Sequence, residues 1–256
     1  MATGPGSSAD RIVFAGHATV LIELDGVRLI TDPLLRGRVA HLRRQPPPVD
    51  RSLTAGLDAV LLSHMHRDHL DLASLRLLGP GTGVLAPAGA GEWLRRRGFT
   101  AVTEMRVGDT EKVGPLSVTA APARHDGARR PGGPRAEALG YVVRGRRSVY
   151  FAGDTALFDE MSDLSQRLDV ALLPVAGWGP TLGPGHMDPL QAARAARLLE
   201  PRVAIPVHWG TLLPTLASPS LRGRLDEPPR VFARHLARLA PGVEVRILRP
   251  GEQLAI

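Results

Sequence analysis

The chain has 256 residues, 43% of them hydrophobic, so it is long enough to bury a substantial core in one large domain or two small ones. It contains no cysteine, which excludes disulfide frameworks and thiolate metal sites. The net charge of +7 comes almost wholly from arginine. Because alanine, glycine and proline are also abundant and aromatic residues make up only 4%, compositional bias explains this charge better than nucleic-acid binding does.

The first ten residues lack the basic and apolar regions of a signal peptide. We therefore expect residues 1–10 to form a short disordered lead and residues 11–256 to form a single domain. No apolar run in the sequence approaches the 18 or so residues that a membrane span requires. The sequence thus predicts a cytoplasmic protein without integral membrane contact.

The first strands are expected at 12–14, 18–24 and 27–31, where apolar and β-branched residues gather. The dipeptide Asp25-Gly26 between the last two is typical of a hairpin turn. From 36 to 54 the composition shifts to arginine and proline without periodicity. This predicts a loop that reaches the mouth of a site.

Residues 63–71, Ser-His-Met-His-Arg-Asp-His-Leu-Asp, crowd three imidazoles and two carboxylates between a predicted strand and a predicted helix. His64 and His66 are two apart in an extended segment, so their side chains leave on the same side and can converge on one ion. Asp68 and His69 follow where the chain turns, and they face a neighbouring position. Imidazole and carboxylate are ligands that zinc, iron and manganese accept, so the stretch predicts a metal site.

The pattern His64-x-His66-x-Asp68-His69 resembles the signature of the metallo-β-lactamase superfamily of binuclear metallohydrolases. Members of that family complete the site with a later His, then an Asp, then a last His, each at the end of a strand. Candidates stand here in that order, namely His125, Asp154 and His208. The resemblance implies an α/β fold, a four-layer αβ/βα sandwich in which two mixed β-sheets are flanked by helices and the metals lie at one edge.

The same resemblance implies two divalent metal ions, zinc first, with manganese or iron as alternatives. The ligands implied for one ion are His64, His66 and His125, and those implied for the other are Asp68, His69 and His208. Asp154 is the implied bridge between the two ions. A hydroxide held between the two ions is the expected nucleophile, because coordination lowers the pKa of water.

The remaining elements alternate along the chain, as an α/β fold requires. Strands are expected at 83–86, 101–105, 116–121, 139–143, 148–152, 169–175, 203–207 and 243–248. Helices are expected at 90–97, 158–167, from 189 onward and at 229–239.

Two loops supply candidates for substrate binding. Arg129 and Arg130 follow the candidate ligand His125 and are predicted to grip an anionic group, although a solvated loop explains them equally well. Trp178 lies in the glycine- and proline-rich segment 176–185, which we expect to shape the pocket, and it is a further substrate-binding candidate.

His186 stands just outside a helix start, because Asp188 is a good N-cap and Pro189 a good first helical residue. The stretch His186-Met-Asp-Pro resembles one branch of the superfamily, which includes N-acylphosphatidylethanolamine-hydrolysing phospholipase D and L-ascorbate-6-phosphate lactonase. In that branch this histidine lies beside the substrate. His186 and Asp68, which is also a ligand, are therefore the predicted catalytic residues.

The N-terminal hairpin, from Gly16-His17 to Asp32-Pro33, is similar to the same branch. His17 is expected to orient a ligand or to face the substrate, and a hydrogen-bonded structural role is favoured. Asp32 is expected to support a ligand or to form a turn.

The branch implies hydrolysis of a phosphodiester or of a phosphorylated lactone or ester, with a small anionic substrate. Two alternatives stay open. A mononuclear iron redox enzyme of the persulfide-dioxygenase type shares the ligand motif. A nucleic-acid-processing hydrolase of the same fold would need a clamp domain or basic arm that the sequence lacks, so no nucleic-acid partner is expected. A homo-oligomer is compatible with the sequence.

Overall fold

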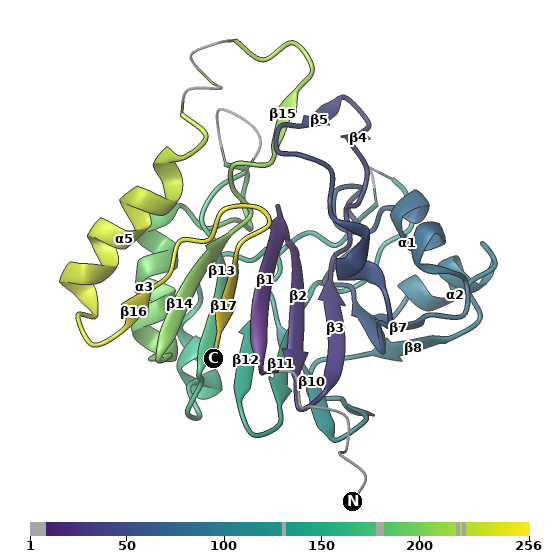
Figure 1. Ribbon diagram of the computed structural model, residues 1–256, viewed down its shortest axis with the longest axis horizontal. Helices are drawn as coiled ribbons and strands as arrows, with labels where there is room; N and C mark the ends of the chain where they lie inside the picture. Colours follow the sequence, from purple (N-terminus) through teal and green to yellow (C-terminus); the bar gives the residue numbers. More distant parts are fainter. Residues whose placement is uncertain (1–8, 130–131, 178–181, 219–220, 222–223) are drawn as a thin grey trace, which may run out of the picture.

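Two seven-stranded β-sheets form the centre of the protein, whose computed structural model describes residues 9–129, 132–177, 182–218, 221 and 224–256 (Figure 1). The strands of the first sheet lie in the order β17 (Gln253–Ala255), β1 (Arg11–Gly16), β2 (Thr19–Leu24), β3 (Val27–Thr31), β6 (Ala59–Leu61), β7 (Gly83–Pro87) and β8 (Val102–Met105). Pairing is antiparallel from β17 to β3 and parallel from β3 to β8, so the sheet is mixed.

The second sheet is mixed as well. Its order is β16 (Glu244–Val245), β14 (Val203–Val207), β13 (Val170–Pro174), β12 (Ser148–Phe151), β11 (Leu139–Arg144), β10 (Leu116–Pro122) and β9 (Thr110–Val113). Strands β16 to β12 pair in parallel, and β12 to β9 pair antiparallel. Almost every residue of the central strands β12, β13 and β14 is buried, as expected of strands covered on both faces.

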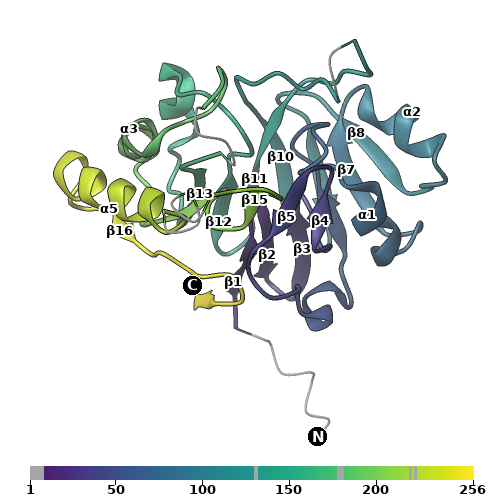
Figure 2. The same cartoon turned by 90° about the horizontal axis from the view of Figure 1, so that it is seen from above.

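Helices cover the outer face of each sheet (Figure 2). Helices α1 (Leu72–Leu78) and α2 (Ala90–Arg95) lie on the side of the first sheet, and α3 (Pro189–Leu199) and α5 (Glu227–Leu239) on the side of the second. The main core, which includes Phe14, Tyr141 and Phe151, joins the two sheets. The predicted four-layer αβ/βα sandwich of two mixed sheets flanked by helices is confirmed.

A third, small sheet lies at one end of the sandwich. Residues 36–54, expected as an irregular loop, contribute β4 (Arg38–Val39), β5 (Leu42–Arg44) and the 3-10 helix η1 (Arg51–Thr54). Strand β15 (Leu212–Pro214) pairs with β5, which also pairs with β4 (Figure 1). Leu34 forms a buried cluster with Val39, Leu42 and Leu212 of these strands. Strands of two or three residues are too short to give an alternating pattern in the sequence.

Other expected elements differ in type or length. The helix expected at 158–167 is a 3-10 helix, η2 (Asp159–Leu164), whose N-terminus has no side-chain cap. The last strand expected at 243–248 shortens to β16, while β9, β15 and β17 were not expected at all. The hairpin at Asp25-Gly26 is confirmed, because both residues have positive φ, as a type I′ turn requires.

The lead expected at residues 1–10 falls largely outside the described residues, which begin at residue 9. Asp10 is described and ordered by contacts, since its Oδ1 accepts a hydrogen bond from the backbone N–H of Asp25 at 2.8 Å. None of the helices in the described part of the chain is long and apolar enough to cross a membrane.

Candidate metal centre

The predicted ligands lie where strands of both large sheets end. His64 to His69 follow β6 of the first sheet, whereas His125, Asp154 and His208 follow β10, β12 and β14 of the second. The turn after β1 adds His17. Because these strand ends meet at the same edge of the sandwich, residues up to about two hundred positions apart in sequence come into contact there.

The first donor cluster consists of His64, His66 and His125. His64 Nε2 lies 2.9 Å from His66 Nδ1, which lies 3.1 Å from His125 Nε2. Tetrahedral nitrogen ligands about 2.0–2.1 Å from a zinc ion lie about 3.3 Å from one another. The spacing of these three nitrogens therefore fits a single ion.

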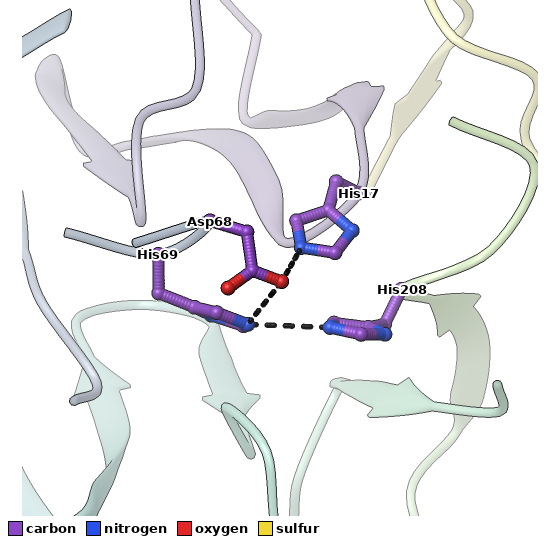
Figure 3. A group of neighbouring side chains, drawn as sticks. All are labelled: His17, Asp68, His69 and His208. Atoms are coloured by element: carbon purple, nitrogen blue, oxygen red, sulfur yellow. Dashed lines mark hydrogen bonds and ion pairs between the residues drawn. The ribbon is translucent and has the colours of Figure 1, made fainter. Parts of the chain in front are cut away.

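The second donor cluster consists of His17, Asp68, His69 and His208 (Figure 3). His69 Nε2 is 3.2 Å from His208 Nε2 and 3.9 Å from Asp68 Oδ2, and the two imidazole rings point their Nε2 atoms at each other. His17 Nε2 approaches the same Asp68 oxygen from the other side, at 3.1 Å.

Asp154 lies between the two clusters. Its Oδ2 is 3.2 Å from His69 Nε2 and 3.3 Å from His208 Nε2. With His125 and His186 it forms a further group of donor atoms on the side of the first cluster. Its Oδ1 is buried and has no hydrogen-bond partner among the described residues. A buried acceptor without a partner is rare in proteins, and this oxygen could bind a cation.

Hydrogen bonds to the far nitrogen fix the tautomer of four histidines. The Nδ1–H groups of His125 and His208 donate to the carbonyls of Gly185 (2.8 Å) and Ala176 (2.7 Å). His69 Nδ1–H donates to Asp32 Oδ2 at 2.7 Å, and His64 Nδ1–H donates to Ser63 Oγ at 2.9 Å. Each Nε2 lone pair is thereby left facing the clusters, as metal ligation requires.

Charge completes the match to a cation. Burial lowers the pKa of His64 well below its ordinary value and the pKa of His125 to about 4, so both rings are neutral. Burial alone would raise the pKa of Asp154, but the neighbouring His208 and His69 lower it by more. The pKa of Asp154 is therefore well below its ordinary value, and the carboxylate is ionised. Neutral imidazole and ionised carboxylate are the forms that bind metals, so His64, His125 and Asp154 fit the ions that the motif implies.

His17 and Asp32 both contact predicted ligands. Burial lowers the pKa of His17 to about 4, and the side chain, 2% exposed, contacts Asp68. Its backbone carbonyl accepts a hydrogen bond from the N–H of His208 at 2.8 Å. Asp32 accepts hydrogen bonds from the N–H and Oγ–H of Ser63 in addition to its contact with His69.

A cavity of about 560 Å³ opens beside the centre. His186 lines it, with Nδ1 3.1 Å from the carbonyl of Gly183 and Nε2 3.5 Å from Asp154 Oδ2. The hydrogen bond with Asp154 raises the pKa of His186, which favours its protonated form. The hairpin of β4 and β5 contributes Val39 and Leu42 to the lining of the cavity.

Three predicted substrate contacts lie in the two loops, and only Arg129 is among the described residues. Arg130 and Trp178 lie outside the described residues. Arg129 is described, but it is absent from the residues that line the cavity, and its guanidinium donates to the backbone carbonyls of Met65 and Leu70. The predicted grip of Arg129 on an anionic substrate therefore has no support in the geometry.

Sequence reasoning missed several residues of the centre. Ser63 was part of the motif but carried no predicted role, although it joins Asp32 to His64. Arg67 was also passed over, and it lines the cavity. The carbonyls of Ala176 and Gly185 left no signal, because backbone acceptors have no residue signature.

Comparison with known proteins gives concordant matches. A family model described as "Beta-lactamase superfamily domain" matches residues 27–209. A UPF0173 metal-dependent hydrolase of Methanopyrus kandleri is 36% identical over 251 residues, which cover 94% of this chain and 98% of that protein. An N-acyl-phosphatidylethanolamine-hydrolyzing phospholipase D of Caenorhabditis elegans is 31% identical over 222 residues, 77% of this chain and 62% of that protein.

The arrangement of the elements has a counterpart among solved structures. Igni18, a metallo hydrolase from the archaeon Ignicoccus hospitalis, matches with a TM-score of 0.71 and 25% sequence identity. The match covers 96% of this chain and 98% of that one, so it extends over both sheets and their helices.

Proposed function

The chain belongs to the metallo-β-lactamase superfamily and is a metal-dependent hydrolase, and from that premise we propose that it holds two divalent ions and hydrolyses a phosphodiester or a phosphorylated lactone or ester. Zinc suits a donor set of imidazole and carboxylate, and manganese or iron would also be accepted. The proposed ligands of one ion are His64, His66 and His125, and those of the other are Asp68, His69 and His208. Asp154 is the proposed bridge between the two ions.

The position of Asp154 carries this proposal. One of its oxygens faces His69 and His208, and the other is buried without a partner among the described residues. Leaving a buried acceptor unpaired costs about 1–3 kcal/mol, and a cation at that oxygen would remove the cost. A carboxylate that contacts His69 and His208 and also lies in a donor group with His125 supports a bridging role.

The proposed chemistry divides between the ions and His186. Divalent ions in such a centre lower the pKa of water from about 16 to about 7 and polarise the attacked oxygen of the substrate. His186 would bind an anionic oxygen or donate a proton to the leaving group, since its partly exposed side chain lines the cavity beside Asp154. The carbonyl of Gly183 holds Nδ1, so Nε2 is the atom that acts.

The cavity supports a substrate of mixed character. Val39, Leu42 and Leu182 give it apolar lining, and Arg67 is the only arginine or lysine among its described lining residues. Similarity to a phospholipase D that hydrolyses N-acyl-phosphatidylethanolamine supports a phosphodiester bond as the target. Arg130 and Trp178 remain predicted contacts. A cytoplasmic location remains a prediction from the sequence.

Metal analysis combined with a substrate screen tests the proposal. The protein is stripped with a chelator and reloaded with zinc or manganese. Metal per chain is then measured alongside hydrolysis of a phosphodiester, a lactone, a β-lactam and a thioester. We expect two ions per chain and metal-dependent hydrolysis of the phosphodiester or the lactone.

Two variants sharpen the test. Asp154→Asn should lose one ion or both together with turnover, because the amide cannot bridge two cations as a carboxylate does. Asp159→Asn, which alters an exposed carboxylate on η2, is the matched control and should change neither. One iron per chain with oxygen-dependent turnover would contradict the proposal and favour the redox alternative.

A further inference from the structure

Arg129 lies in the segment between β10 and β11, far in sequence from the ligand motif, yet it contacts both ends of that motif. Its Nη1 donates to the carbonyl of Met65 at 3.0 Å and to the carbonyl of Leu70 at 2.5 Å. Between these two carbonyls stand three proposed ligands, His66, Asp68 and His69. One guanidinium nitrogen thus joins the two ends of residues 65–70, the ligand loop.

The loop has few other internal restraints. The N–H groups of His69 and Leu70 both donate to the carbonyl of His66, at 3.2 and 2.8 Å, which makes a tight turn. Met65 and Leu70 are fully buried, and Arg129 is the only donor to either of their carbonyls among the described residues. Without Arg129, two buried carbonyls at the ends of the turn would lose their hydrogen bonds.

Arg129 holds this place without a carboxylate partner among the described ion pairs. Burial lowers the pKa of Arg129 to about 10, and the neighbouring Arg67 adds to the shift, so the guanidinium stays charged at neutral pH. Its Cζ lies 4.9 Å from the ring centre of Trp93 on α2, and Arg97 packs on the same ring at 3.7 Å. A cation over an aromatic ring offsets part of the cost of burial.

We infer that Arg129 is a positioning residue for the metal centre: it sets the spacing of His66, Asp68 and His69 before any ion binds. The inference rests on the proposed function, because it presupposes that these residues bind metal. A role in gripping substrate is disfavoured, since Arg129 does not line the cavity and Arg67 does. Residues that hold ligands in place typically contribute 10–100-fold to metal affinity.

The test compares variants of two arginines that share Trp93. Arg129→Met keeps the length of the stem but removes both hydrogen bonds, Arg129→Lys keeps the charge with a single amine, and Arg97→Met is the control on the same ring. For each, the zinc dissociation constant is measured by competition with a chelator. The melting temperature is measured with and without zinc. KM and kcat are measured with a phosphodiester as substrate.

We expect Arg129→Met to raise the zinc dissociation constant by about 10–100-fold, with the number of ions at saturation unchanged. The stabilisation that zinc gives should shrink accordingly. Arg129→Lys should show a smaller rise in the zinc dissociation constant. If Arg129→Met does not fold, this rise in Arg129→Lys tests the inference in its place. Arg97→Met should leave zinc affinity unchanged.

Two results would overturn the inference alone. An unchanged zinc dissociation constant, with melting temperatures lowered equally in the stripped and loaded protein, would make Arg129 merely structural. An unchanged dissociation constant with a raised KM would make it a substrate contact. Wild-type protein that binds no zinc, manganese or iron would instead overturn the proposed function, and the inference with it.

Discussion

At the scale of single residues, replacing His186 distinguishes a role in turnover from a role in metal binding. It touches Asp154 and lies in a donor group with His125, so the geometry permits a ligand as well as a proton donor. Its 23% exposed side chain lines the cavity, which favours contact with substrate. We expect His186→Ala to keep the full metal content and to lower kcat by about 10²–10⁴-fold. Loss of an ion on metal analysis would show instead that His186 is a ligand.

His17 is the residue that we expect to control the second ion. It holds Asp68 by its Nε2 and adopts φ +58°, a left-handed conformation that asparagine tolerates well. His17→Asn should therefore keep the backbone but fall short of Asp68, so that the second ion binds about 10–100-fold more weakly than it does in the wild-type protein.

Zinc titration monitored by metal content measures this effect on the two positions. His235→Asn, in α5, is the matched control, because His235 belongs to none of the donor groups among the described residues. Two ions bound with unchanged affinity in His17→Asn would mean that Asp68 needs no support from His17.

That these donor side chains lie close together was predictable, because metal-binding chemistry is evident from the residue types. His64, His66, Asp68 and His69 fall within six positions, and metal-binding side chains so close together are rarely there for another reason. Their supports were not predictable in the same way. The carbonyls of Ala176 and Gly185 can belong to any residue. Arg129 acts through backbone atoms 59 and 64 positions away, which only the fold brings near.

At the scale of elements, the turn after β12 shows why a glycine precedes Asp154. Gly153 has φ +62°, and a Cβ there would lie 2.6 Å from Ser63 Cβ and 3.0 Å from the carbonyl oxygen of Leu139. The backbone at Gly153 therefore lies directly against Ser63, the residue that joins Asp32 to His64.

Gly153→Ala should therefore destabilise the protein by strain and by crowding together. Gly56 has nearly the same φ, +61°, and a methyl group there would meet nothing within 4 Å, so Gly56→Ala isolates the cost of the backbone conformation, about 1–2 kcal/mol. We expect Gly153→Ala to lower the free energy of unfolding by about 1–3 kcal/mol more than Gly56→Ala does. Urea unfolding compares the two, and equal losses would show that Ser63 yields without cost.

The longer elements were predictable and the short ones were not. Strand β14 was expected with its observed bounds, because five apolar residues in a row match a strand buried on both faces. Strands β4, β5 and β15 have two or three residues each, and they form only because they pair with one another over Leu34 and Leu212. No local pattern carries that information, so the wall of the cavity was predicted only as a loop.

At the scale of the whole molecule, the centre joins the two halves of the sandwich. The first sheet supplies His64 to His69 through β6, and the second supplies His125, Asp154 and His208 through β10, β12 and β14. Neither half alone holds all of the donor residues. Alternating strands and helices were enough to predict the layers, but not how closely the donors of the two sheets approach one another.

Removing the metal should therefore weaken the fold as a whole. An ion present at a thousand times its dissociation constant stabilises a protein by about 4 kcal/mol. For a chain of this size each kcal/mol shifts the melting temperature by about 2–4 °C, so chelation should lower it by roughly 10 °C. Adding zinc back should restore the loss, whereas calcium, which prefers oxygen ligands, should not. Differential scanning calorimetry measures the shift, and identical melting curves before and after chelation would mean that the two sheets hold together without a cation between them.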